Sequence, residues 1–293
     1  MLGDPGRSNL RLMSAQLALV TDSTAYLPQE VVDRHRISVV PLSVVVGDEV
    51  LTEGVEIAPK DVAEALRAKQ RLTTSRPNPE TFAAAYKAAA AAGATGVVSV
   101  HISGELSGTG EAARLAAAEA PLPVRVVDSR LVGMALGYTV LAAAEARDAG
   151  LDLDEVAAAA ERRAAGIRSF FYVDTLEHLR RGGRIGTARA LLGSALAVKP
   201  LLHLDGGRIE PLEKVRTASR AIARLEEIAV EEAGTRAVDV TVHHLAAADR
   251  AEPLAERLRE RVPGLRELYV GEVGAVIGAH VGPGLLAVVV APV

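Results

Sequence analysis

The stretch "TGVVSVHISGELSGTGEAARLAAA", residues 95–118, joins an apolar run to an alanine-rich run through serines and glycines. The apolar run at 95–101 has the length and β-branched content of a buried strand. The alanine-rich run after Ser107 favours a helix. The stretch therefore predicts a strand, a polar loop and a helix in succession, with a candidate binding loop at residues 101–110.

Segments typical of strands and helices alternate on both sides of this unit. Besides 95–101, strands are expected at 16–21, 37–46 and 123–128. Helices are expected to begin at Pro28, Pro59, Pro79 and about Gly133, with a loop over 72–82. This alternation indicates a parallel sheet covered by helices. The carboxyl ends of parallel strands meet at one edge, where ligands bind, so three hydroxyl-rich loops should gather there: 21–24, 103–110 and 128–130.

The second half of the chain has a different pattern. Apolar residues alternate around a Gly-Gly pair at 199–216, which indicates an antiparallel hairpin, and the apolar C-terminal stretch is interpreted as a loop followed by a buried strand. We therefore expect an α/β protein of two domains, the first with a parallel helix-covered sheet and the second a mixed α+β domain. The expected divisions are a disordered leader at 1–14, an N-terminal domain at 15–165 and a C-terminal domain at 166–293.

Composition excludes several classes of function. The net charge of −4 is spread along the chain, which argues against a nucleic-acid partner. The absence of cysteine excludes disulfides, thiolate catalysis and Cys-ligated zinc, and the seven histidines are scattered, so no metal site is expected. No stretch has the ~20 unbroken apolar residues of a membrane span. With no signal-peptide pattern at the N-terminus, a cytoplasmic location is expected.

Four functions of the loop at 101–110 remain open from the residues alone. "GTGEAA" at 108–113 fits a dinucleotide-binding pattern, although its glycines fall late in the loop and Asp128, which ends the next strand, is followed by Ser-Arg. Ser107 could be a hydrolase nucleophile, although Glu105 stands where G-x-S-x-G needs glycine. The hydroxyls could simply cap the following helix. Finally, the helix N-terminus, with hydroxyls from Ser107 and Thr74, could hold a carboxylate.

Motifs spread over most of the chain resemble those of the DegV family. They run in the family's order from about residue 16 to the C-terminus: "DSTAYLP" (22–28), "TTSRPNPETF" (73–82), "HISGELSGTGEAA" (101–113), "VVDSRLVGMALG" (126–137), "LEHLRRGGRIG" (176–186), "KPLLHLDGGRIEPLEKVR" (199–216) and "HVGPG" (280–284). The resemblance implies two domains with a fatty-acid tail buried between them. It also implies a lipid-binding protein rather than an enzyme, with no cofactor beyond the bound fatty acid.

The resemblance also assigns residues. Thr74 of the "TSxP" loop and Ser107 of "LSGT" are expected to bind the carboxylate of a long-chain fatty acid of the palmitate or oleate class. His280, before "GPG", is the expected third contact, and Ser75 and Ser103 are expected to support the loops.

Some relatives present the acyl carboxylate to a separate fatty acid kinase subunit, which makes an acyl phosphate. By this resemblance Arg184 of "GGRI" is expected on the kinase-facing surface. The alternative function is a serine hydrolase or acyl transferase that uses Ser107. Three departures from the family pattern concern the fine geometry. Arg76 stands in "TSRPN" where glutamine is usual, Gly104 stands in "ISG" where a second serine is common, and "GEAA" follows "LSGT" where "YQSA" is usual.

Overall fold

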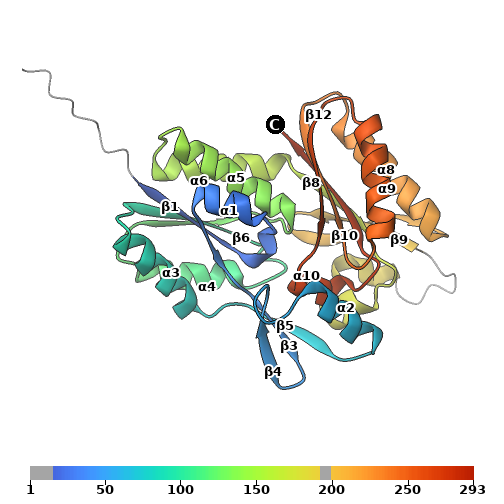
Figure 1. Ribbon diagram of the computed structural model, residues 1–293, viewed down its shortest axis with the longest axis horizontal. Helices are drawn as coiled ribbons and strands as arrows, with labels where there is room; N and C mark the ends of the chain where they lie inside the picture. Colours follow the sequence, from blue (N-terminus) through green and yellow to red (C-terminus); the bar gives the residue numbers. More distant parts are fainter. Residues whose placement is uncertain (1–15, 192–198) are drawn as a thin grey trace, which may run out of the picture.

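The computed structural model describes residues 16–191 and 199–293, so the expected leader at 1–14 lies outside the described residues. Its first sheet is parallel and has the strand order β2-β1-β6-β7 (Figure 1). The strands are β1 (Leu17–Asp22), β2 (Ile37–Val40), β6 (Gly96–His101) and β7 (Val124–Asp128). All six residues of β6 are buried, as expected for a central strand with helices on both faces.

Helices cover both faces of this sheet, which confirms the predicted fold class (Figure 1). Apolar side chains of one helix pair form a core on one face, and those of the other pair form a core on the opposite face. The first pair is α5 (Met134–Asp148) and α6 (Leu153–Gly166); the second is α3 (Pro79–Ala91) and α4 (Thr109–Ala118). The short α1 (Gln29–His35) follows η1 (Ser23–Ala25).

The second sheet has six strands in the order β10-β9-β8-β13-β11-β12 and is mixed. Within it β11 and β12 pair in parallel, and the other neighbours are antiparallel. The predicted hairpin is confirmed, because β9 and β10 pair around Gly206 and Gly207, both with positive φ. The strands are β8 (Arg168–Tyr172), β9 (Lys199–Asp205), β10 (Arg208–Val215), β11 (Val238–His244), β12 (Leu265–Glu272) and β13 (Leu286–Pro292).

The two faces of the second sheet are covered differently. On one face lie α8 (Ala218–Ala233) and α9 (Ala248–Arg261), whose apolar residues build a continuous core with the strands. On the other face lie shorter elements: α7 (Glu177–Arg181), η2 (Gly186–Leu191) and α10 (Ala275–Val281). This second face is turned toward the first sheet, and α5 packs directly against β13.

A third, small sheet departs from the predicted elements. Residues 37–46 were expected to form one strand, but the chain breaks at Pro41, which cannot donate to a ladder, into β2 and a separate β3. The segment 72–82 was expected to be a loop, yet its first residues form a strand at the sheet edge, held by pairing with β3. The small sheet consists of β3 (Ser43–Val46), β4 (Glu49–Thr52) and β5 (Leu72–Ser75), beside α2 (Pro59–Arg67).

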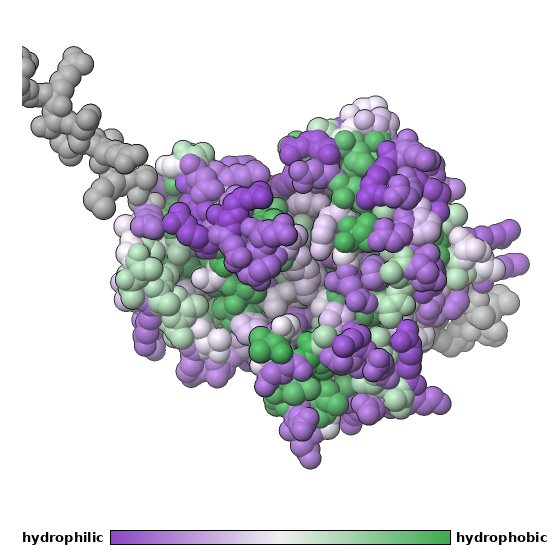
Figure 2. Space-filling view, viewed as in Figure 1, coloured by the Kyte–Doolittle hydropathy of each residue, from purple (hydrophilic) through white to green (hydrophobic). Residues whose placement is uncertain are grey.

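The small sheet also carries part of the apolar surface. Figure 2 shows hydrophobic residues gathered over this region. Val50 at the hairpin is 61% exposed and Val55 beyond it is 80% exposed. In the described part of the chain, no helix is long and apolar enough to cross a bilayer.

The C-terminal stretch corrects another expectation. Residues before the last strand were interpreted as a loop, but Ala275–Val281 form α10. Valine, isoleucine and glycine in this segment have low helix propensity. The helix forms because its buried side chains pack in one core with Leu42, Val44 and Val62 from the small sheet and α2. His280 therefore lies in the last turn of a helix rather than in a loop.

Candidate functional site

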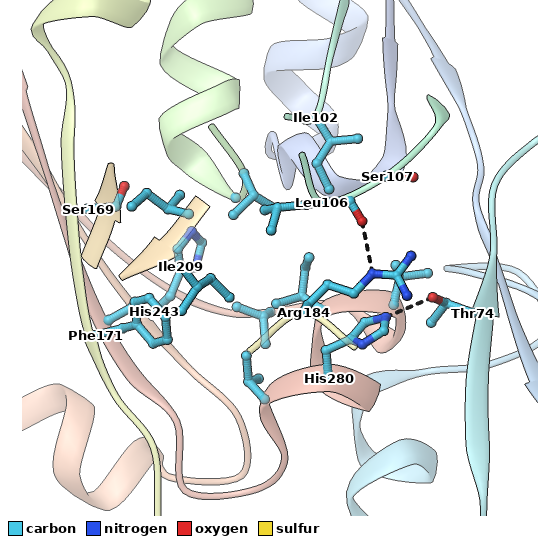
Figure 3. A pocket seen from close by; sticks show the side chains of 18 of the residues that line it. Thr74, Ile102, Leu106, Ser107, Ser169, Phe171, Arg184, Ile209, His243 and His280 are labelled. Carbon is cyan, nitrogen blue, oxygen red and sulfur yellow. Dashed lines mark hydrogen bonds between the residues drawn. The ribbon is translucent and has the colours of Figure 1, made fainter. Parts of the chain in front are cut away.

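A cavity of about 390 Å³ lies between the loops of the first sheet and the face of the second sheet that carries α7, η2 and α10. Most of its wall is apolar, with side chains from both halves of the chain. Polar side chains gather at one end, where the 101–110 loop, β5, α10 and the segment after α7 meet (Figure 3). We call this the polar end, defined by Thr74, Ser107, Arg184 and His280.

Thr74 and His280 are brought together although 206 positions separate them in the sequence. The Thr74 Oγ1 atom lies 2.8 Å from Nε2 of His280, so the two side chains hydrogen-bond (Figure 3). The other ring nitrogen, Nδ1, is buried and has no partner among the described residues. Burial, with a smaller contribution from the Arg184 charge, lowers the pKa of His280 to about 4, so the ring is neutral at pH 7.

Gly182 leaves the room that the His280 ring occupies. A Cβ atom at position 182 would collide with Nδ1 of His280, so a larger residue there would displace the ring from Thr74. The glycines of the "GGRIG" motif therefore allow the His280 ring to pack against the backbone at Gly182, in addition to the arginine that the motif supplies.

Ser107 lies in the loop that leads from β6 into α4, and its side chain lines the cavity. Its hydroxyl lies 2.8 Å from Oγ1 of Thr109, and among the described residues it contacts no histidine. The expected side-chain cap is not formed in the described structure, because the N-cap of α4 is Gly108, which has no side chain to bond the backbone N–H groups of the first turn. The N-terminus of α4 thus faces the cavity beside the Ser107 hydroxyl.

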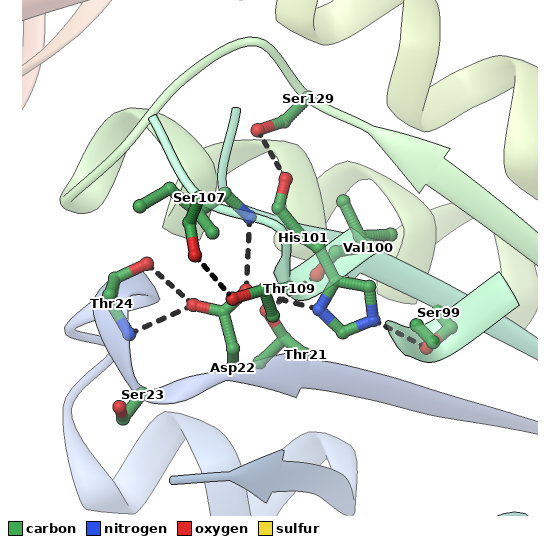
Figure 4. Close-up of polar contacts among 12 residues, drawn as sticks. Thr21, Asp22, Ser23, Thr24, Ser99, Val100, His101, Ser107, Thr109 and Ser129 are labelled. Carbon is green, nitrogen blue, oxygen red and sulfur yellow. Dashed lines mark hydrogen bonds and ion pairs between the residues drawn. The ribbon is translucent and has the colours of Figure 1, made fainter. Parts of the chain in front are cut away.

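The loop carrying Ser107 is held by a buried carboxylate at the end of β1. Asp22 accepts hydrogen bonds from the Ile102 N–H (2.9 Å) and the Thr24 N–H (3.1 Å), and it contacts Nδ1 of His101 at 3.0 Å (Figure 4). His101 also contacts the Ser99 hydroxyl at 2.7 Å. Asp22 and His101 are fully buried, so this network fixes the loop and is closed to solvent.

The predicted gathering of three loops at one sheet edge is confirmed by direct contacts. The Ser129 hydroxyl donates to the His101 carbonyl at 2.7 Å, and the Gly104 N–H donates to Asp128 at 3.2 Å. Ser103 crosses to the second sheet, because its buried hydroxyl donates to the Gly207 carbonyl in the β9–β10 turn at 2.8 Å. Ser103 thus joins the 101–110 loop to the β9–β10 turn, and its role in supporting a binding loop stays a prediction.

Ser75 is placed less tightly. It is exposed at the edge of the cavity mouth, and its hydroxyl donates to the Arg76 carbonyl at 3.2 Å. The Arg76 side chain lies against Gly108 and pairs weakly with Glu111, at 3.5 Å. Arg76 therefore adds a half-exposed cation at the mouth of the cavity.

Arg184 was expected on a partner-facing surface, and the structure places its side chain in the cavity wall. Its Nε donates to the Leu106 carbonyl at 3.0 Å (Figure 3). Its Nη1 donates to the Gly182 carbonyl at 2.6 Å. The guanidinium thereby joins the Ser107 loop to the segment beside His280. The motif "GGRI" gives no sign that the arginine folds back over the loop, and the place of Arg184 on a kinase-facing surface stays a prediction.

Glu53 positions the helix that carries His280. This carboxylate is 6% exposed and accepts a hydrogen bond from the Val276 N–H at 2.8 Å and another from the Ser23 hydroxyl. Burial raises its pKa. No motif signalled this residue, because its partners in η1 and α10 come close to it only in the folded chain.

Two further polar side chains line the cavity away from the polar end: Ser169 on β8 and His243 on β11 (Figure 3). His243 accepts from the Met134 N–H at 3.0 Å and lies 3.2 Å from the Gly271 carbonyl, so both ring nitrogens are occupied. Burial lowers the pKa of His243 to about 4. Its neighbour His244 points to the opposite face of the strand, as alternation predicts, and contacts Glu272.

The charge of the cavity favours an anion. Its described lining contains Arg76 and Arg184 and no aspartate or glutamate. Within residues 16–191 and 199–293, no three histidine or carboxylate side chains cluster as metal ligands.

Comparison with known proteins establishes the family. The pattern of the DegV family, described as "Uncharacterised protein, DegV family", matches residues 16–293. The chain belongs to the DegV family. A DegV domain-containing protein of Streptomyces coelicolor is 65% identical over 278 residues, covering 95% of this chain and 99% of its own length. Protein DegV of Bacillus subtilis is 36% identical, covering 93% and 98%.

Solved structures of DegV proteins share the fold. A DegV family protein from Thermus thermophilus, described by its fatty acid binding, superposes with a TM-score of 0.90 at 36% identity, covering 95% of this chain and 100% of its own. DegV of Bacillus subtilis, described as a fatty acid binding protein, gives 0.88 at 34% identity, covering 96% and 100%. The recognised motifs therefore identified both the family and the fold.

Proposed function

We propose that this DegV protein binds a long-chain fatty acid of the palmitate or oleate class in the cavity, with the carboxylate held at the polar end by Thr74 and Ser107. The observation that carries this proposal is the separation of the cavity into a largely apolar interior and one polar end that combines neutral donors with a guanidinium. The solved relatives described as fatty acid binding, with sequence identities of 36% and 34%, support the same ligand class.

His280 orients the Thr74 hydroxyl. A buried N–H without a partner is rarer in proteins than an under-used acceptor, which favours the tautomer with its proton on Nε2 and a bare Nδ1. Nε2–H then donates to Oγ1 of Thr74 across their 2.8 Å contact. The Thr74 proton is left to point toward the carboxylate, so His280 acts through Thr74.

The remaining donors come from the other side of the polar end. The Ser107 hydroxyl and the uncapped N-terminus of α4 face the same space, and a helix N-terminus favours an anion. Arg184 uses Nε and Nη1 on carbonyls, which leaves Nη2 to meet a carboxylate oxygen. One carboxylate thus receives hydroxyl donors, a helix dipole and a positive charge.

The acyl tail supplies most of the affinity. Each methylene that moves from water into the apolar interior contributes about 0.8 kcal/mol. The polar end then fixes the direction of the chain and distinguishes acids from alcohols and esters, because only an ionised acid presents two negatively charged oxygens to the donors.

Presentation to a fatty acid kinase completes the proposal. The carboxylate would lie near the cavity mouth, where Arg76 is half-exposed, while the tail stays buried. A kinase subunit docking over Arg76 and Arg184 could reach the head group without removing the tail. In this role the protein is a non-catalytic binding subunit, acting in fatty acid metabolism in the cytoplasm.

The first experiment is native mass spectrometry of freshly purified protein, followed by denaturing extraction. We expect a stoichiometric added mass that extracts as a long-chain fatty acid. Protein that carries no lipid and also refuses added palmitate and oleate would overturn the proposal. Labelling of Ser107 by a fluorophosphonate, lost in Ser107→Ala, would instead support the hydrolase or acyl transferase.

A further inference from the structure

One hydrogen-bonding group in the apolar part of the cavity has no use in binding a plain hydrocarbon tail. Ser169 lines the cavity from β8, where alternation places it on the same face as Phe171. Ser169 is 7% exposed, and its hydroxyl has no hydrogen-bond partner among the described residues. In Figure 3 it lies far from Thr74, on the opposite side of the cavity.

The surroundings of Ser169 are apolar or already satisfied. Val289, its neighbour across the sheet, lines the same wall. His243 also lines this part of the cavity, and both of its ring nitrogens are occupied by backbone groups. A buried hydroxyl without a partner destabilises the fold, and alanine or valine would serve a plain tail better.

We propose that Ser169 forms a second polar contact with the ligand, by recognising a hydroxyl or oxo group carried on the acyl chain. This inference rests on the proposed function. A neutral group fits and an anionic one does not, because both arginines of the described lining, Arg76 and Arg184, lie at the polar end and its mouth. The ligand class is therefore a hydroxylated or oxo fatty acid rather than a dicarboxylic acid.

The test compares octadecanoate with a series of octadecanoates hydroxylated at successive carbons, by competition against a fluorescent fatty acid. In the wild type, we expect one position of the hydroxyl to bind tighter than the unsubstituted acid. Ser169→Ala should lower the affinity for that isomer about tenfold, the effect of one buried hydrogen bond, and leave octadecanoate binding unchanged or slightly tighter. Ser169→Thr, which keeps a hydroxyl, should retain the preference.

Val289→Ala is the matched control, because it enlarges the same wall without removing a polar group. It should weaken octadecanoate and its hydroxylated isomers equally. The proposal is overturned if Ser169→Ala has no effect across the series or weakens every ligand to the same degree. If octadecanoate itself does not bind the wild type, the proposed function fails as well, so the two failures are distinguishable.

Discussion

The polar end of the cavity and its apolar wall are built in opposite ways. The polar end is assembled from four separate segments. Long-range contacts join Thr74 to His280 and Arg184 to the Leu106 carbonyl, whereas Ser107 contacts only its neighbour Thr109 among the described residues. The apolar wall on the second sheet comes from neighbouring antiparallel strands whose alternate residues face inward. In the proposed function, recognition of the carboxylate would therefore depend on a few precise contacts, whereas binding of the acyl tail would depend on the total apolar area buried.

The support beneath the polar end should give the largest effect. Asp22→Ala removes the acceptor for the Ile102 and Thr24 N–H groups and the partner of His101, all buried. We expect the free energy of unfolding to fall by about 3–5 kcal/mol, the cost of breaking a buried pair. Urea denaturation measures this loss. Asp48→Ala, in an exposed turn, is the control and should change stability by less than about 0.5 kcal/mol.

Filling the apolar wall tests the other side of the comparison. Ala287 lines the cavity from β13, and Ala287→Phe should exclude about three methylenes, which lowers palmitate affinity by about 2–3 kcal/mol. Octanoate, which does not need the full length, should keep its affinity. Titration calorimetry with both acids measures the difference, and Ala287→Val should give a smaller effect. Equal losses for the two acids would show that the tail does not follow this wall.

Acid should destabilise both regions through one histidine in each. His280 and His243 have their pKa lowered from 6.5 to about 4, so below pH 6.5 the unfolded chain takes up protons that the folded chain does not. The free energy of unfolding should therefore fall as the pH drops from about 6.5 toward 4. At pH 5, each histidine should lower the free energy of unfolding by up to about 2 kcal/mol relative to neutral pH. The contribution of His280 should be smaller, because its side chain is partly exposed.

Urea denaturation of His280→Gln and His243→Gln at a series of pH values checks this dependence. Each variant should lose less stability than the wild type between pH 7 and pH 5, and should run parallel to it between pH 7 and 8. A pH dependence as steep in the variants as in the wild type would contradict the assignment.

The smallest effects are expected from the head-group hydroxyls. Thr74→Ala and Ser107→Ala should each weaken fatty-acid binding by about 1–2 kcal/mol, the scale of one hydrogen bond to a charged group, without unfolding the protein. Thr73→Ala is the matched control, because Thr73 is exposed on the opposite face of β5. Unchanged affinity in both Thr74→Ala and Ser107→Ala would remove the proposed carboxylate site.

Sequence reasoning predicted most of the helices and strands, and it predicted which loops meet at one edge of the first sheet. Both predictions follow from local patterns. It failed where tertiary pairing overrides those patterns. β5 is a polar edge strand without alternation and forms by pairing with β3, and α10 is a weak helix former held by its packing against α2 and the small sheet. Both errors affected the site directly, because these two elements carry Thr74 and His280.

The sequence by itself determined the fold class, the meeting of the hydroxyl-rich loops at one sheet edge, and the family, because strand and helix periodicity and motif order are properties of neighbouring residues. Only the tertiary structure decided that Arg184 turns into the cavity, that His280 meets Thr74, and that Ser169 is buried without a partner. These facts depend on contacts between segments far apart in the chain, which no local pattern encodes.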